Sequence, residues 1–108
     1  MNSIKITCFI RAVDDYDRIL CEIIKINGSS DIYGEIKKNM FDYEIIDNFT
    51  FCRIKINLKY KNYVVTMCNE HIKNASVIEI ICKKRYYPYG EKKQTHGCAL
   101  DMILMNKV

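Results

Sequence analysis

The chain lacks most of the sequence features that mark an enzyme, a membrane protein or a secreted protein. No glycine-rich phosphate loop, nucleophile elbow or HExxH zinc motif occurs in it. No apolar run approaches the ~20 residues that a membrane-spanning helix needs. The first residues carry a charge inside their apolar segment and have no small-residue cleavage site. We therefore expect a non-enzymatic, intracellular protein of the cytoplasm or nucleus of a host cell, with no cofactor and no membrane partner.

Linkers, internal repeats and low-complexity tracts are also missing, so residues 1–108 are expected to form one domain with one modest core. The chain has one proline and no tryptophan, and its lysines outnumber its arginines thirteen to four. Together with abundant isoleucine and asparagine, this usage follows from AT-rich codons. It suggests a virus, a phage or a plasmid-like element as the source.

Six cysteines are present. An even number of cysteines and three glycosylation sequons keep a secreted, disulfide-bonded protein open as an alternative. However, Cys8, Cys52 and Cys82 each continue a run of alternate isoleucines, where cysteine acts as a small hydrophobic residue of a core. We therefore expect reduced, buried thiols.

Hydrophobic residues alternate along most of the chain, and the apolar runs are rich in residues typical of strands. These patterns predict strands at 3–13, 17–26, 32–37, 43–46, 49–59, 62–68, 77–87 and 98–106. A hairpin turn is expected at 14–17, a loop at 27–31, a tight reversal at 60–63 and one short helix at 69–76. The predicted fold class is all-β, mainly antiparallel, as a small OB-like barrel or a curved sheet.

Positive charge is concentrated in the second half of the chain. Residues 1–54 carry seven Lys or Arg against nine Asp or Glu, whereas residues 55–108 carry ten against four. This imbalance predicts an anionic partner for the second half. The densest stretch is KKRYYPYGEKK at 83–93, with five basic side chains and three tyrosines. We expect an arm that holds phosphates and bases; the alternative is an ordinary hairpin tip kept soluble by lysine.

Two other strands combine outward phenylalanine with outward cations. If Cys52 faces the core, alternation puts Ile54, Ile56 and Leu58 inward and the residues between them outward. Phenylalanine on a solvent-facing strand position needs a reason, and single-stranded nucleic acid supplies one, because bases stack on rings while cations follow the phosphates. The alternative is that these rings pack in a second small core.

The candidate nucleic-acid-binding residues fall into two groups, a platform on two strands and an arm. The platform residues are Phe9, Arg11, Phe51, Arg53 and Lys55, and the arm residues are Lys83, Lys84, Arg85, Tyr86, Tyr87, Tyr89, Lys92 and Lys93.

The C-terminal stretch GEKKQTHGCALDMILMNKV resembles the final hairpin of compact phage and viral single-stranded DNA-binding proteins. A polar arm gives way there to small residues and then to an apolar strand, at Gly97, Cys98, Ala99, Leu100, Asp101 and Met102. The resemblance implies an OB-fold and strand binding that tolerates many base sequences. The chain lacks the long acidic tail of many such proteins, which puts recruitment of replication partners by a tail in doubt.

The expected function is binding of single-stranded DNA or RNA in the replication of a viral or plasmid-like element. The alternative is a β-rich interaction module that targets a host or defence factor with the same exposed aromatics. Replication or host proteins and a second copy of the chain are further candidate partners. Cys68, His71, His96 and Cys98 supply ligand types that zinc takes, but we expect ordinary loop histidines and core cysteines, and so no metal.

Overall fold

The computed structural model describes residues 3–27, 44–46, 49–86 and 98–108. Its strands are β1 (Ser3–Val13), β2 (Arg18–Asn27), β3 (Glu44–Ile46), β4 (Phe49–Lys55), β5 (Val77–Tyr86) and β6 (Cys98–Lys107). A 3₁₀ turn, η1 (Leu58–Tyr60), leads into the helix α2 (Lys61–Asn74).

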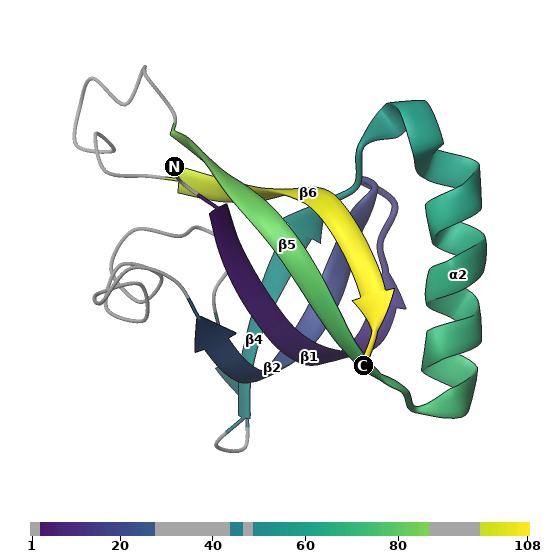
Figure 1. Ribbon diagram of the computed structural model, residues 1–108, viewed down its shortest axis with the longest axis horizontal. Coiled ribbons are helices and arrows are strands. Elements are labelled where there is room, and N and C mark those ends of the chain that lie inside the picture. The colour runs from purple at the N-terminus through teal and green to yellow at the C-terminus, as the bar shows by residue number, and fades with distance from the viewer. Residues whose placement is uncertain (1–2, 28–43, 47–48, 87–97) are drawn as a thin grey trace.

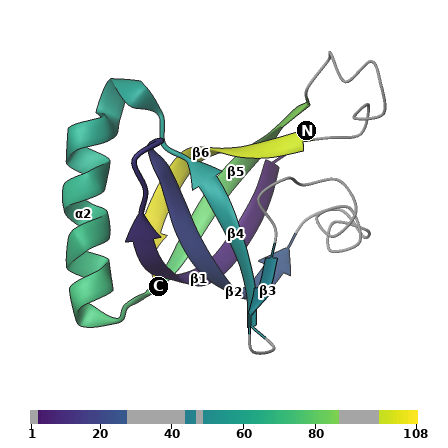
Figure 2. The same cartoon turned by 180° about the vertical axis from the view of Figure 1, so that it is seen from behind.

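Five of these strands close into a ring in the order β1, β2, β4, β6, β5, and β3 pairs with β4 outside the ring. Figure 1 shows β1, β5 and β6 on the near side, and Figure 2 shows β2 and β4 from behind. Among the described pairings only β4–β6 is parallel; it joins Ile54 to Leu100 and Lys55 to Asp101. The prediction of a mostly β, mainly antiparallel protein with one helix is therefore confirmed, and the sheet is mixed.

The core lies inside the ring because alternate residues of its strands point inward. On β1 the buried residues are Ile4, Ile6, Cys8 and Ile10, as the sequence predicts. The corresponding residues of the other strands join them in one buried cluster, and α2 packs against β1 beside one end of the ring (Figure 1).

The thiols belong to this core. Cys8, Cys21, Cys52, Cys68 and Cys82 are all buried, in agreement with the prediction for Cys8, Cys52 and Cys82. A hydrogen bond with Cys8, followed by burial, raises the pKa of Cys21, and burial raises the pKa of Cys82. Because the thiolate is the reactive form, these groups are packing residues rather than nucleophiles.

The predicted strand at 62–68 and the reversal at 60–63 are wrong, since residues 61–74 form α2. The run YVVT suggests a strand because it is rich in β-branched residues. In the structure Val64, Cys68 and Ile72 recur at helical spacing on the side that contacts the core. Thr66 satisfies its hydroxyl within the helix by donating to the Asn62 carbonyl at 3.0 Å. The predicted helix at 69–76 therefore begins eight residues too late.

The predicted strand at 49–59 is too long, because β4 ends at Lys55. The Ile56 N–H donates to the Asp17 carbonyl at 2.8 Å, and the Asn57 side chain accepts from Lys59 N–H at 3.0 Å to begin η1. Ile56 remains buried as predicted, but Leu58 is 59% exposed, so the prediction that Leu58 points inward is wrong.

The remaining elements agree with prediction to within one or two residues. β1, β2, β3, β5 and β6 lie where strands were expected, and residues 14–17 form the β1–β2 turn. The predicted strand at 32–37 and residues 28–31 of the predicted loop lie outside the described residues. Within the described ranges, no helix is long and apolar enough to cross a membrane.

Candidate nucleic-acid interface

The strand register places the two platform phenylalanines in one row across the outer face of the ring. Phe9 of β1 lies opposite Glu22 of β2, and Glu22 in turn lies opposite Phe51 of β4. Both rings are half-buried and lie on the outer side of strands whose neighbouring residues fill the core. The two predicted halves of the platform therefore share a surface, with β2 between them.

Glu22 holds the cation of this row in place. The Arg11 guanidinium lies 5.0 Å from the centre of the Phe9 ring and 2.7 Å from the Glu22 carboxylate. The outward direction of Phe9 and Arg11 is as predicted, but the carboxylate partner is not. Arg11 can still donate from its other N–H groups, since a guanidinium carries five donors. Its charge is nevertheless largely balanced.

The second part of the platform lies further along β4. Arg53 is opposite Leu20, and Lys55 is opposite Arg18, so three cations collect where β2 and β4 approach the β1–β2 turn. Lys55 Nζ donates to the Tyr16 carbonyl at 3.1 Å, and Lys55 lies opposite Asp101 of β6. This end of the face is the more positive one and suits an anion.

Asp14 organises the turn beside these cations. One of its carboxylate oxygens accepts from the Tyr16 and Arg18 backbone N–H groups, at 2.8 and 3.1 Å. The other accepts from Arg18 Nε at 2.9 Å and lies 4.0 Å from Arg53 Nε. Burial by itself raises the pKa of Asp14, but the two backbone hydrogen bonds and the Arg18 guanidinium outweigh it and lower the pKa below its ordinary 3.8.

Because the folded protein lowers this pKa, the ionised Asp14 stabilises the fold above the unfolded-state pKa, and the stabilisation is lost as pH falls below it. We expect Asp14→Ala to lower the free energy of unfolding by about 1–2 kcal/mol at pH 7. The difference between variant and wild type should shrink between about pH 5 and pH 2. Urea unfolding across this range measures it, with the neighbouring exposed Asp15→Ala as control. A loss that does not depend on pH would contradict this role.

The predicted arm is described in part. β5 runs to Tyr86, which pairs with Cys98 of β6, so β6 begins at Cys98, the residue at which the sequence predicts the chain to return. Lys83 is exposed, and Lys84 and Arg85 continue the pairing with β6 through their backbones. Tyr87, Tyr89, Lys92 and Lys93 lie outside the described residues. The role of the arm therefore stays a prediction.

The zinc alternative gains no support from the described residues. Cys68 and His71 are buried on α2, whereas His96 and the Cys98 side chain lie outside the description. The Cys68 thiol donates to the Met105 sulfur at 3.9 Å, and burial raises its pKa to about 12. In the part of the chain that the structure describes, no three His, Cys, Asp or Glu side chains are placed to share an ion.

A small pocket of about 240 Å³ lies where β4 and β6 separate beyond their parallel pairing. Lys55, Ile56, Asn57, Asp101 and Met102 line it. It opens beside the cationic end of the β2–β4 face, through Lys55. The pocket has one side chain of each charge and is too small to serve as more than an edge of a larger interface.

The sequence pointed to β1 and β4 but missed β2, which lies between them. Arg18, Leu20 and Glu22 all take outward positions, and the same alternation that identified Phe51 could have identified them. The decisive contacts, from Glu22 to Arg11 and from Asp14 to Arg18, depend on which strands are neighbours.

No family model matches this chain, and searches of curated proteins and of solved structures found no match.

Proposed function

We propose that this chain is an OB-fold protein that binds single-stranded DNA or RNA on the outer face of β2 and β4, without catalysing a reaction. An OB-fold is a partly open Greek-key barrel of five strands. Its second and third strands, with the loops after the first and the fourth, hold oligonucleotides. In this chain the corresponding strands are β2 and β4, and residues 14–17 form the loop after the first strand.

The observation that carries the proposal is the order of the ring. Counted along the chain without β3, the ring strands are β1, β2, β4, β5 and β6. The first three, β1, β2 and β4, are neighbours in the ring, the third and fifth, β4 and β6, are parallel, and α2 lies between the third and the fourth, β4 and β5. These features agree with OB topology. In that topology Phe51, Arg53 and Lys55 lie on the outer face of the second and third strands. The sequence had selected these three residues on other grounds, from their outward direction and chemistry.

The face also has the two chemical properties that single strands need. Half-buried rings give bases a surface for stacking, and cations can follow the phosphates. Four cations, Arg11, Arg18, Arg53 and Lys55, lie near three carboxylates, Asp14, Glu22 and Asp101. The positive excess favours a nucleic acid, and a role in the replication of a viral or plasmid-like element would use such binding.

A second candidate function is a protein-interaction module. The observation that favours it is the pairing of Arg11 with Glu22 and of Arg18 with Asp14, which gives the face charges of both signs. Phe, Tyr and Arg are also common at protein interfaces. A host or defence protein would then take the place of the nucleic acid.

Fluorescence anisotropy with labelled single-stranded DNA, single-stranded RNA and duplex DNA separates the two functions. A strand-binding protein should prefer a single strand to the duplex and bind it more weakly as salt rises, with a slope of about −0.7 per phosphate contacted. Absence of binding to every oligonucleotide at about 50 mM salt would overturn the proposal and leave the interaction module.

A further inference from the structure

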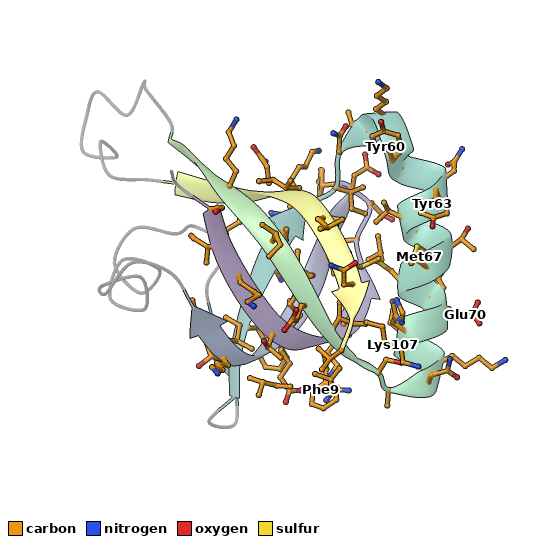
Figure 3. The ribbon with its side chains drawn as sticks, viewed as in Figure 1. Phe9, Tyr60, Tyr63, Met67, Glu70 and Lys107 are labelled. Atoms are coloured by element: carbon orange, nitrogen blue, oxygen red, sulfur yellow. The ribbon has the colours of Figure 1, made fainter. Side chains whose placement is uncertain are left out.

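Three tyrosines near the start of α2 are exposed, although tyrosine usually packs its ring. Tyr16 in the β1–β2 turn is 71% exposed, Tyr60 at the end of η1 is 54% exposed and Tyr63 in the first turn of α2 is 68% exposed. Figure 3 shows Tyr60 and Tyr63 on neighbouring turns at one end of the helix. Single exposed apolar residues are ordinary, but these three belong to connected elements.

Direct contacts connect those elements. Lys61 at the start of α2 forms an ion pair of 3.0 Å with Asp17, the residue after Tyr16 in the β1–β2 turn. The Ile56 N–H, just before η1, donates to the Asp17 carbonyl at 2.8 Å. Tyr16 and Tyr60 are each adjacent in sequence to one end of the Asp17–Lys61 ion pair. The turn and the start of the helix therefore form one surface.

Two of these rings also carry a cation. The Arg18 guanidinium lies 5.4 Å from the centre of the Tyr16 ring, and Lys59 Nζ lies 5.6 Å from that of Tyr60. A ring beside a cation is the combination that holds a base and its phosphate together. The same combination occurs at Phe9 and Arg11.

The surface that carries these tyrosines lies beyond the Lys55 end of the outer face of β4. From Phe51 to Lys55 the outer face of β4 advances towards the β1–β2 turn, and Lys55 Nζ donates to the Tyr16 carbonyl at 3.1 Å. Beyond Lys55 the chain continues directly into η1 and α2. The cationic end of the face therefore leads onto the tyrosine surface.

We infer that a bound single strand longer than the β2–β4 face continues across the β1–β2 turn onto the start of α2. There Tyr16, Tyr60 and Tyr63 stack on its bases, and Lys59 lies beside its phosphates, since Arg18 and Lys61 already pair with Asp14 and Asp17. This inference rests on the proposed function and extends it, since it assigns a second binding segment and a larger site. The partner is single-stranded nucleic acid, recognised by its bases and backbone rather than by its sequence.

The test compares a short oligonucleotide of about 4 nucleotides with one of about 12, within the range of OB-fold site sizes. The double variant Tyr16→Ala, Tyr60→Ala should bind the longer strand at least about tenfold more weakly, because the two lost stacking contacts together contribute more than that factor. Its affinity for the shorter strand should equal that of wild type. Tyr63→Ala should show the same selectivity if the double variant is unstable, and thermal melting verifies folding.

A second comparison changes single charges, Lys59 in η1 and Lys73 in α2. Lys59→Gln should weaken binding of the longer strand, whereas Lys73→Gln, near the other end of α2, should leave it unchanged. Equal losses for both oligonucleotides, or no loss for either, would overturn the inference while the proposed function stands. Failure of the wild-type protein to bind either oligonucleotide would overturn both.

Discussion

The Ile54→Ala variant is expected to lose about 2–5 kcal/mol of its free energy of unfolding, because the substitution leaves a cavity in a packed core. Ile54 is fully buried in β4 and lies between Ile19 of β2 and Leu100 of β6. It is one of the two β4 residues that pair with β6, so it packs where the ring closes. A domain of this size has a total stability of about 5–15 kcal/mol, and the loss should be plain in urea unfolding.

Ile103→Ala provides the matched control. Ile103 lies on β6 but is 57% exposed, so its removal should change the free energy of unfolding by no more than about 0.5 kcal/mol. If the two variants were equally stable, β4 and β6 would not meet as described, and the ring would be open at this point.

The second large effect concerns binding. Phe51→Ala should weaken the binding of a single-stranded oligonucleotide by about 1–3 kcal/mol, the contribution of one stacked base. Because stacking releases no counterions, the dependence of affinity on salt should remain that of wild type. Lys55→Gln should instead reduce the salt slope by about 0.7, since one phosphate contact is removed. Anisotropy titrations at several salt concentrations measure both quantities.

Conservative variants guard against an indirect effect of packing. Phe51→Tyr retains the aromatic ring and should bind as wild type does, whereas Phe51→Leu retains an apolar side chain without the ring and should bind as weakly as Phe51→Ala. Wild-type affinity in Phe51→Leu would mean that the ring only packs against its neighbours. The outer face of β4 would then have no role in stacking.

The strands that the sequence predicted well are those with a clean alternation between core and solvent. β1 is the best example, since each of its inward residues from Ile4 to Ile10 is buried and its bounds agree with the prediction. A period of two leaves little freedom in which face is buried. The outward direction of Phe9 and Arg11 follows from the same alternation and needed no knowledge of the neighbouring strands.

α2 could not be recognised from residue types alone. Val64, Val65 and Thr66 favour strands individually, whereas the spacing of Val64, Cys68 and Ile72 is that of a helix. Packing of that apolar face against the ring decides in favour of the helix, because intrinsic propensity is a weak effect beside tertiary burial. A search for helical spacing within 61–74 would have corrected the prediction.

The contacts of the candidate interface depend on pairing between distant segments. Glu22 reaches Arg11 because β1 and β2 form a hairpin, and it separates Phe9 from Phe51 because β4 pairs with the other edge of β2. The parallel pairing of β4 with β6 spans more than forty residues of sequence. Neither composition nor periodicity contains such register, so the sequence identified the aromatic and basic residues but not the carboxylates that balance them.

Amide chemical shifts followed by NMR while single-stranded DNA is added test the central claim most directly, since they report which backbone groups sense the bound strand. The account predicts that the largest changes fall on the β2–β4 face, at Glu22, Phe51, Arg53 and Lys55, with further changes at Tyr16 when the strand is long. Unchanged shifts at these five residues, with changes confined to other surfaces of the ring, would contradict it.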